Sequence, residues 1–258
     1  MIGFLLRKTL YDLWDNLLAI ALVNFGFLVS AAVPLLLPSA LAAAPALGAL
    51  ALAGGVAWCC VYLAGAAGAV TAVSDYGGFG LMEFLRALKR SWMTGLAAAA
   101  GAVALTLIAS AAIPFYLSFR NMPGFLAAAL LFWVIAATAL AAQFFLSVSA
   151  RVDRRPSRAV KLCFLMLLES PGFCALAALQ SLALLGLSLF LAFLLPGPGA
   201  VLLFLDEAVR LRVLRDEWLA AHPEADRRRT PWGEILAEER ERTGTRSLRN
   251  FLFPWKRD

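Results

Sequence analysis

Histidine and paired cysteines are scarce in this chain, which has a single histidine, His222, among 258 residues. A triad that uses histidine, or a metal site built from several histidines, is therefore nearly excluded. The four cysteines form no Cys-x-x-Cys pair, so neither a zinc site nor a structural disulfide is indicated. Phosphate-binding loops, HExxH and the GxSxG nucleophile motif are also lacking. The sequence thus predicts no catalytic residue, no cofactor and no metal site, and we expect a protein that is not an enzyme.

Charge is also scarce, at 16% of residues against 62% hydrophobic residues and a mean hydropathy of +0.79. The charged residues fall in short clusters between apolar stretches long enough to cross a bilayer as a helix, which takes about 20 residues. No alternating pattern supports a membrane β-barrel, and helices satisfy their own backbone in lipid. The sequence therefore predicts an all-α fold, a polytopic transmembrane helical bundle. Five stretches without Asp, Glu, Lys or Arg are its expected spans: 17–37, 47–73, 94–119, 124–149 and 172–195.

The basic residues predict the orientation of these spans. Two precede the first span, three lie at 86–90, one is Arg120, five lie at 151–161 and twelve follow from Arg210 onward. Basic loops remain in the cytoplasm, which puts the N-terminus and the loops at 86–90 and 151–161 inside. An even number of spans would also keep the basic tail inside.

We therefore expect a short sixth span near 187–205, giving about six spans with both termini cytoplasmic. The expected domains are a transmembrane domain over 1–205 and a charged tail over 206–258. The alternative is five spans followed by an interfacial helix, since a large tail can translocate despite its charge. Ala40-Leu41-Ala42 resembles a signal-peptidase site, but the long apolar run before it favours a retained first helix.

Amphipathic segments precede the spans. Leu81, Leu85, Leu88 and Trp92 share one helical face, which predicts an interfacial helix. The run at 86–89 is echoed at 158–161, and a divergent copy could lie at 4–14. We hypothesise a threefold parallel repeat of interfacial helix plus hairpin, although the positive-inside rule alone would also put basic residues before each outgoing helix.

Uncharged polar residues are the candidates for a site inside the spans. Asn24, Gln143 and Gln180 are costly to leave without partners at membrane depth, so they form our candidate intramembrane polar site. The alternative is that they join helices by hydrogen bonds. The small-residue runs at 65–69 and 95–101 suit close helix packing. The spans contain no ionisable acid or base, which disfavours a proton-coupled transporter.

Acidic residues near the expected membrane boundary offer one enzymatic alternative. Glu169, Asp206 and Glu207 could serve an intramembrane hydrolase. The alternative is a structural role on a solvated helix face, where Asp206 would pair with Arg210 and Arg212 with Asp216 at i, i+4.

The tail has its own expected helices and a membrane anchor. The first helix runs to Trp218 and ends before Pro223; the second is capped by Thr230, opens at Pro231 and stops near Gly244. Eleven acids interleave with the bases of the tail, which disfavours nucleic-acid binding. Bases and aromatics alternate at the C-terminal end, a mixture that suits anionic lipid headgroups. The candidate anchor residues are Arg246, Arg249, Phe251, Phe253, Trp255 and Lys256.

One family resemblance covers roughly residues 10–215. Asn16-Leu17-Leu18 leading to Pro34, the hairpin to Tyr62 and Val73, and the run from Phe84 to Trp92 resemble the YesL family of bacterial membrane proteins. The Thr-Ile-Gly that typically follows the first-helix proline of that family is missing. The resemblance implies a small multi-span protein, sometimes encoded near carbohydrate-uptake systems, and offers no catalytic residue.

Two functions follow as hypotheses. The favoured one is a non-enzymatic accessory or scaffold component of the bacterial inner membrane, whose partners are the lipid bilayer and another membrane protein. The alternative is a facilitative permease for a neutral solute, which unwound helices at Pro34, Pro45, Pro114 or Pro171 would support.

Overall fold

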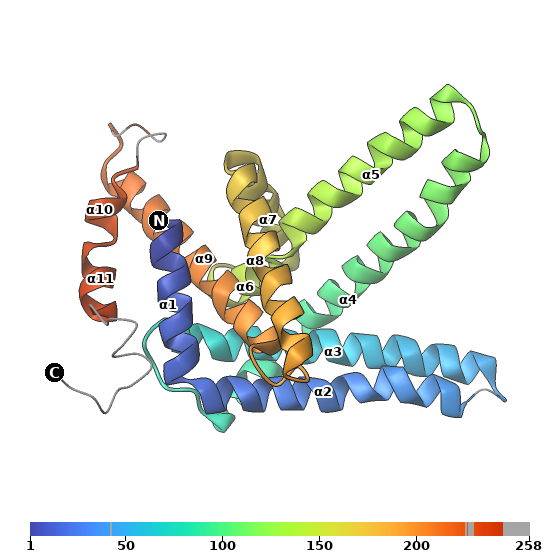
Figure 1. The fold of residues 1–258 in the computed structure, drawn as a ribbon, viewed down its shortest axis with the longest axis horizontal. Helices are drawn as coiled ribbons and strands as arrows, with labels where there is room; N and C mark the ends of the chain where they lie inside the picture. The colour runs from blue at the N-terminus through green and yellow to red at the C-terminus, as the bar shows by residue number, and fades with distance from the viewer. Residues whose placement is uncertain (42, 225, 227–229, 245–258) are drawn as a thin grey trace.

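The computed structural model describes residues 1–41, 43–224, 226 and 230–244, and every regular element in these ranges is a helix (Figure 1). The all-α prediction is therefore confirmed. In chain order the helices are α1 (Ile2–Asp15), α2 (Leu17–Ala40), α3 (Pro45–Ser74), α4 (Leu81–Ser118), α5 (Met122–Ala142), α6 (Phe145–Arg151), α7 (Pro156–Glu169), α8 (Pro171–Phe190), α9 (Gly197–Ala221), α10 (Trp232–Ile235) and α11 (Ala237–Thr243).

Five of these segments are long and apolar enough to cross a membrane, which fits a multi-pass membrane protein. They are α2, α3, α4, the nearly continuous α5–α6 segment and α8, and they overlap the five predicted spans. Pro34 and Pro114 lie inside continuous helices, whereas Pro45 and Pro171 occupy first helical positions, where no backbone N–H is needed. None of the four prolines therefore marks an unwound span.

The sixth predicted span does not appear among these five. After α8 the chain turns at 191–196 and continues into α9, whose first turns are apolar but whose middle contains Asp206, Glu207 and Arg210. Residues 202–209 of α9 are all buried inside the protein. This helix is thus packed against its neighbours along the stretch that was expected to be a membrane crossing.

The predicted interfacial helix at 81–92 is not separate from the span that follows it. Helix α4 runs without interruption from Leu81 to Ser118, since no proline or unfavourable turn residue separates the amphipathic part from the apolar part. The corresponding α7, in contrast, ends at Glu169 before the Ser170-Pro171 step that opens α8. The two copies of the suspected repeat thus differ at this junction, and the repeat stays a prediction.

Glycines set the closest helix contacts. A Cβ atom at Gly95 would lie 2.4 Å from the Cα of Val61, and one at Gly65 would lie 3.0 Å from the Cα of Leu88. These positions bring α3 and α4 to backbone distance, as the small-residue runs predicted. At Gly101, farther along α4, nothing lies within 4 Å. The close packing therefore involves only the first half of α4.

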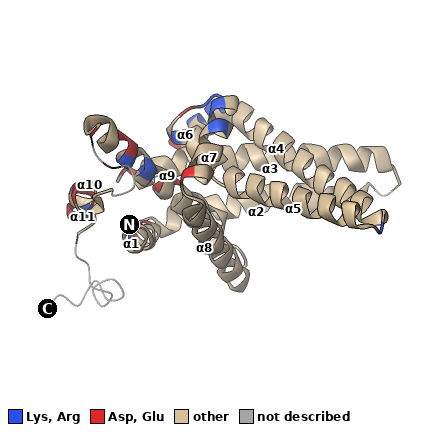
Figure 2. Cartoon of the chain, turned by 90° about the horizontal axis from the view of Figure 1, so that it is seen from above, with Lys and Arg blue, Asp and Glu red and all other residues tan. Residues whose placement is uncertain are grey.

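Figure 1 shows the consequence of this packing, because the α2–α3 and α4–α5 hairpins share a base and then diverge. The largest apolar core lies at that base, where α5, α6, α7, α8 and α9 meet around Phe144, Cys163 and Cys174. Charges concentrate there too, on α1, the first turns of α4, α6, α7, α9, α10 and α11, while the outer parts of the hairpins are almost free of them (Figure 2). We call this charged side of the protein the polar end.

The tail contains two short helices. Helix α9 ends at Ala221, before Pro223, as predicted, whereas the expected second helix is interrupted at Leu236 and divided into α10 and α11. Leu236 is fully buried in the main core, which fixes its backbone at the break. Gly244 ends α11 with a φ of 71°. The anchor predicted at 246–256 lies outside the described residues.

Candidate functional site

Asn24 has a structural role in the turn between α8 and α9. Its side-chain nitrogen donates to the carbonyl oxygens of Leu194 and Pro196 at 2.9 and 2.8 Å, and its oxygen accepts from the Gly199 amide at 2.7 Å. Gly197 adopts a φ of 64°, and a Cβ there would lie 2.3 Å from the Asn24 side chain. The Gly199 amide lies in the first turn of α9 and the two carbonyl groups lie in the turn before it, so Asn24 holds this turn against α2.

Gln143 and Gln180 do not join Asn24 in a common site. Gln143 donates to the carbonyl oxygens of Leu140 and Cys174, both at 2.9 Å, and so connects the α5–α6 junction to α8. Gln180 is half-buried on α8. The structure therefore supports the alternative interpretation of Asn24 and Gln143, in which polar side chains join helices.

Eight ionisable residues come together at the polar end instead, from α1, α6, α9, α11 and the end of α3. We call them the charged cluster: Lys8, Asp12, Asp75, Arg151, Asp206, Glu207, Arg210 and Glu239.

Lys8 is the centre of the first part of the charged cluster. Its ammonium pairs with Asp12, lies 3.7 Å from Glu207 and donates to the Ser74 carbonyl oxygen at 3.2 Å. The Tyr76 ring faces it at 4.1 Å. Lys8 is 2% exposed and Glu207 1% exposed. Such deeply buried charges require partners, so these contacts fix α1 against α9.

Arg151 is the centre of the second part. Its guanidinium pairs with Asp206 at 2.5 Å and Asp75 at 2.9 Å and donates to the Ser74 hydroxyl at 2.9 Å. Thr71 donates to the other oxygen of Asp206 at 3.2 Å. The end of α3, helix α6 and helix α9 are thereby joined around one guanidinium.

Arg210 connects the tail to this arrangement. It pairs with Asp75 at 2.7 Å and with Glu239 of α11 at 2.7 Å. The Tyr76 hydroxyl donates to Glu239 at 2.9 Å and lies 3.1 Å from the hydroxyl of Thr243. Helix α11 is therefore held against α9 and the end of α3 through a charged group and a tyrosine.

The predicted pairing of Asp206 with Arg210 is wrong. Asp206 points toward α6 and pairs with Arg151, while Arg210 reaches away from its own helix to Asp75 and Glu239. The i, i+4 rule applies to a solvated face, whereas Asp206 is fully buried and takes its partner from another helix. The predicted pair of Arg212 and Asp216 is present at 3.5 Å.

Burial shifts the protonation of two groups in this region. Burial raises the pKa of Glu207 well above its usual 4.5, although Lys8 opposes the shift, and the negative charge of Asp12 raises it further. Burial likewise raises the pKa of Tyr76 to about 12, so its hydroxyl stays a donor to Glu239.

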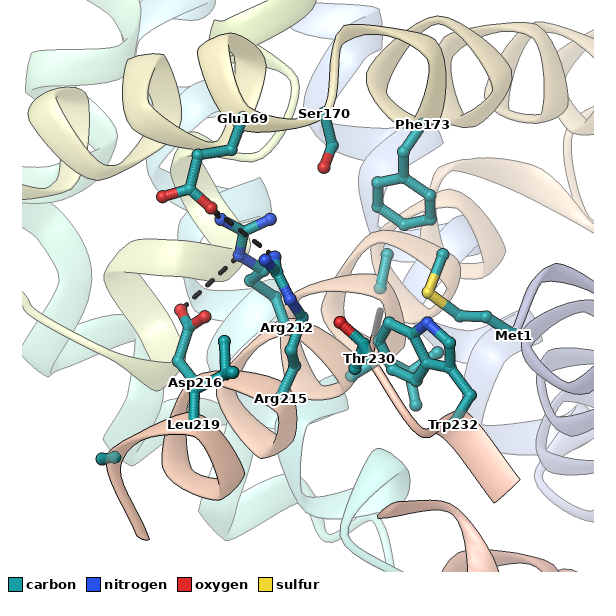
Figure 3. A pocket seen from close by; sticks show the side chains of 13 residues that line it. Met1, Glu169, Ser170, Phe173, Arg212, Arg215, Asp216, Leu219, Thr230 and Trp232 are labelled. Atoms are coloured by element: carbon teal, nitrogen blue, oxygen red, sulfur yellow. Dashed lines mark ion pairs between the residues drawn. The ribbon is translucent and has the colours of Figure 1, made fainter. Parts of the chain in front are cut away.

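A cavity of about 760 Å³ lies beside the charged cluster, between the α7–α8 junction, α9 and α10 (Figure 3). Arg212 and Arg215 both pair with Glu169 at its rim, Arg215 at 3.5 Å. Phe173 and Trp232 face the cavity from the opposite side. Its two arginines and two acids balance, so the cavity has no excess charge that would select an ion. Glu169 is thus engaged in ion pairs, as Asp206 and Glu207 are.

Sequence reasoning did not find the charged cluster. Lys8 and Arg151 enter the sequence analysis only among the basic residues that predict orientation, and Asp75 does not enter it. The signal that could have indicated a buried site was the adjacent pair Asp206-Glu207 directly after an apolar run.

Comparison with protein-family models, with curated proteins and with solved structures finds no match.

Proposed function

We propose that this protein is a non-enzymatic accessory or scaffold component of a bacterial inner membrane system, with its polar end and both termini in the cytoplasm. The YesL resemblance suggests a system linked to carbohydrate uptake. The docking of α11 on the charged cluster is the observation that best supports this function, because it fixes the tail at a defined position on the membrane domain.

The pairing of the charges favours a structural role over a chemical one. Each acid of the charged cluster has a partner within the protein, from Arg151 on Asp206 to Thr9 on Glu207. A catalytic acid or base needs access to a substrate proton, whereas Asp206 and Glu207 are completely enclosed. Their geometry suits a rigid platform for a partner protein.

The permease alternative lacks its expected structural support. Helices α2 and α4 are continuous through Pro34 and Pro114, and Pro45 and Pro171 begin helices. The cavity of about 760 Å³ lies at the polar end, between the α7–α8 junction, α9 and α10, and a smaller one lies where α3, α4 and α6 meet at that end.

In-membrane crosslinking with mass spectrometry tests the proposed function. The tagged intact chain is compared with a chain truncated after Pro223 and with Glu239→Ala, which removes the carboxylate that holds α11. Glu241→Ala is the matched control, since Glu241 is exposed on the same helix. We expect one specific partner that is lost on truncation, reduced in Glu239→Ala and unchanged in Glu241→Ala. The absence of a partner from every sample would contradict the proposal and justify solute-flux assays in liposomes.

A further inference from the structure

A second cavity of about 320 Å³ lies at the polar end, between α3, α4 and α6. Small residues of α3, among them Gly68 and Ala72, form its base. Four charged side chains line it: Arg86, Arg90 and Arg154, with Glu83 as the one acid. The cavity therefore has an excess of positive charge, in contrast to the balanced cavity beside α10.

The arginines of this cavity are not neutralised in place. Across residues 1–41, 43–224, 226 and 230–244, Arg90 and Arg154 have no ion pair or side-chain hydrogen bond, and Arg86 donates only to the Met82 carbonyl, at 3.3 Å. Elsewhere at the polar end, Arg151, Arg210, Arg212 and Arg215 each pair with a carboxylate. These three arginines are exposed, and with Glu83 as the one acid they leave a net positive charge around the cavity, which attracts anions.

A buried hydroxyl provides an independent observation. Ser149 on α6 lines the cavity, is 3% exposed, and its Oγ has no hydrogen-bond partner within the described part of the chain. A buried polar group without a partner costs about 1–3 kcal/mol, so such groups usually mark a place for a missing ligand or water. Thr94, which is 5% exposed, brings a second hydroxyl to the cavity. Guanidinium and hydroxyl donors together form the usual set that binds phosphate.

The position of the cavity indicates where such a phosphate would come from. Along α4 the charged residues end at Arg90, and the charge-free span begins at Thr94. Between them Trp92 and Met93 are 50% and 63% exposed, as expected of side chains at the lipid boundary. Lipid headgroups occupy this level of a membrane.

We propose that this cavity binds the phosphate of an anionic phospholipid, with Arg90 and Arg154 as its main ligands, Arg86 at the rim and Ser149 as a buried donor. Soluble phosphate shares this chemistry, but it would not need a site at the edge of the apolar surface. This inference concerns residues outside the charged cluster, so it does not depend on the proposed scaffold function.

The test uses the full chain in detergent, titrated with phosphatidylglycerol or phosphatidylcholine and observed by native mass spectrometry. The variant is Arg90→Gln with Arg154→Gln. The matched control is Lys89→Gln with Arg155→Gln, which removes the same charge from exposed sequence neighbours that do not line the cavity. We expect phosphatidylglycerol to bind more tightly than phosphatidylcholine, about tenfold weaker binding to the variant, and little change in the control.

Three outcomes have definite meanings. An equal loss in variant and control would mean that only the overall charge matters and would overturn the site. Unchanged phosphatidylglycerol binding in the variant would also overturn it. Competition by millimolar inorganic phosphate, without preference between the lipids, would support the phosphate chemistry but overturn its lipid source. Ser149→Ala gives a second measurement, with an expected loss of about threefold. All variants should keep the helical circular dichroism of the parent.

Discussion

The polar end and the α4–α5 hairpin are stabilised by opposite means. At the polar end, helices distant in sequence are joined by buried ion pairs such as Arg151–Asp206, and Lys8, Asp206 and Glu207 are almost completely enclosed. In the hairpin, Leu107, Leu126 and Trp133 are 60%, 70% and 69% exposed, and the chain diverges from the rest of the protein. The polar end is thus held together by contacts within the protein, whereas the α4–α5 hairpin depends on lipid or a partner helix to cover its apolar side chains.

This difference follows from the solvent that each region meets. Apolar side chains lose nothing by facing hydrocarbon, so lipid or a partner helix can cover the hairpin without further specification. Charged side chains at the membrane boundary must be paired or hydrated. Defects at the polar end should therefore be costly, and defects in the outer hairpin should be tolerated.

The largest expected effect comes from removing the cation of the first part of the charged cluster. Lys8→Met leaves Asp12 and Glu207 buried without their ammonium, which should cost about 3–5 kcal/mol of unfolding free energy. Denaturant unfolding in mixed micelles measures it. Lys89→Met, an exposed lysine on α4, is the control and should change stability by less than about 0.5 kcal/mol. Equal effects of the two substitutions would mean that the buried ion pairs of Lys8 add no stability beyond that of an exposed lysine.

The sequence predicted the long apolar helices well because they depend only on the length and composition of a continuous run of residues. Runs without charge of about 20 residues indicate membrane helices whatever their neighbours are, and all five predicted runs overlap helices that are long and apolar enough to cross a membrane. The charged cluster depends on pairs such as Lys8 with Glu207 and Asp75 with Arg210, which are far apart in sequence. Spacing rules describe neighbours on one helix, so they assigned Arg210 to the wrong acid.

Glycine substitutions in α4 give an intermediate effect and locate the boundary between the two regions. A Cβ at Gly95 meets the backbone of Val61, so Gly95→Ala should push α3 and α4 apart at a cost of about 1–3 kcal/mol. Gly101→Ala adds a methyl group in open space and should be neutral or stabilising by about 1 kcal/mol, because alanine favours the helix. The same micellar unfolding assay compares them. Destabilisation by Gly101→Ala would show that the hairpin packs farther along α4 than its divergence indicates.

A pH dependence of stability is the effect expected from Glu207. Its folded-state pKa is raised by burial and by Asp12, so between about pH 4.5 and that raised pKa the folded protein keeps a proton that the unfolded chain releases. Stability from this group is therefore fully present below pH 4.5 and decreases as pH rises, by at most about 1.4 kcal/mol for each pH unit. Glu207→Gln cannot titrate and retains polar contacts toward Thr9, so its unfolding free energy should decrease less between pH 5 and pH 8 than that of the parent. Lys8, Asp12, Arg210 and Tyr76 are present in both proteins, so the difference between the two pH profiles follows from the replacement of Glu207. Parallel profiles would mean that Glu207 is ionised in the folded protein and that Lys8 outweighs the cost of burying its charge.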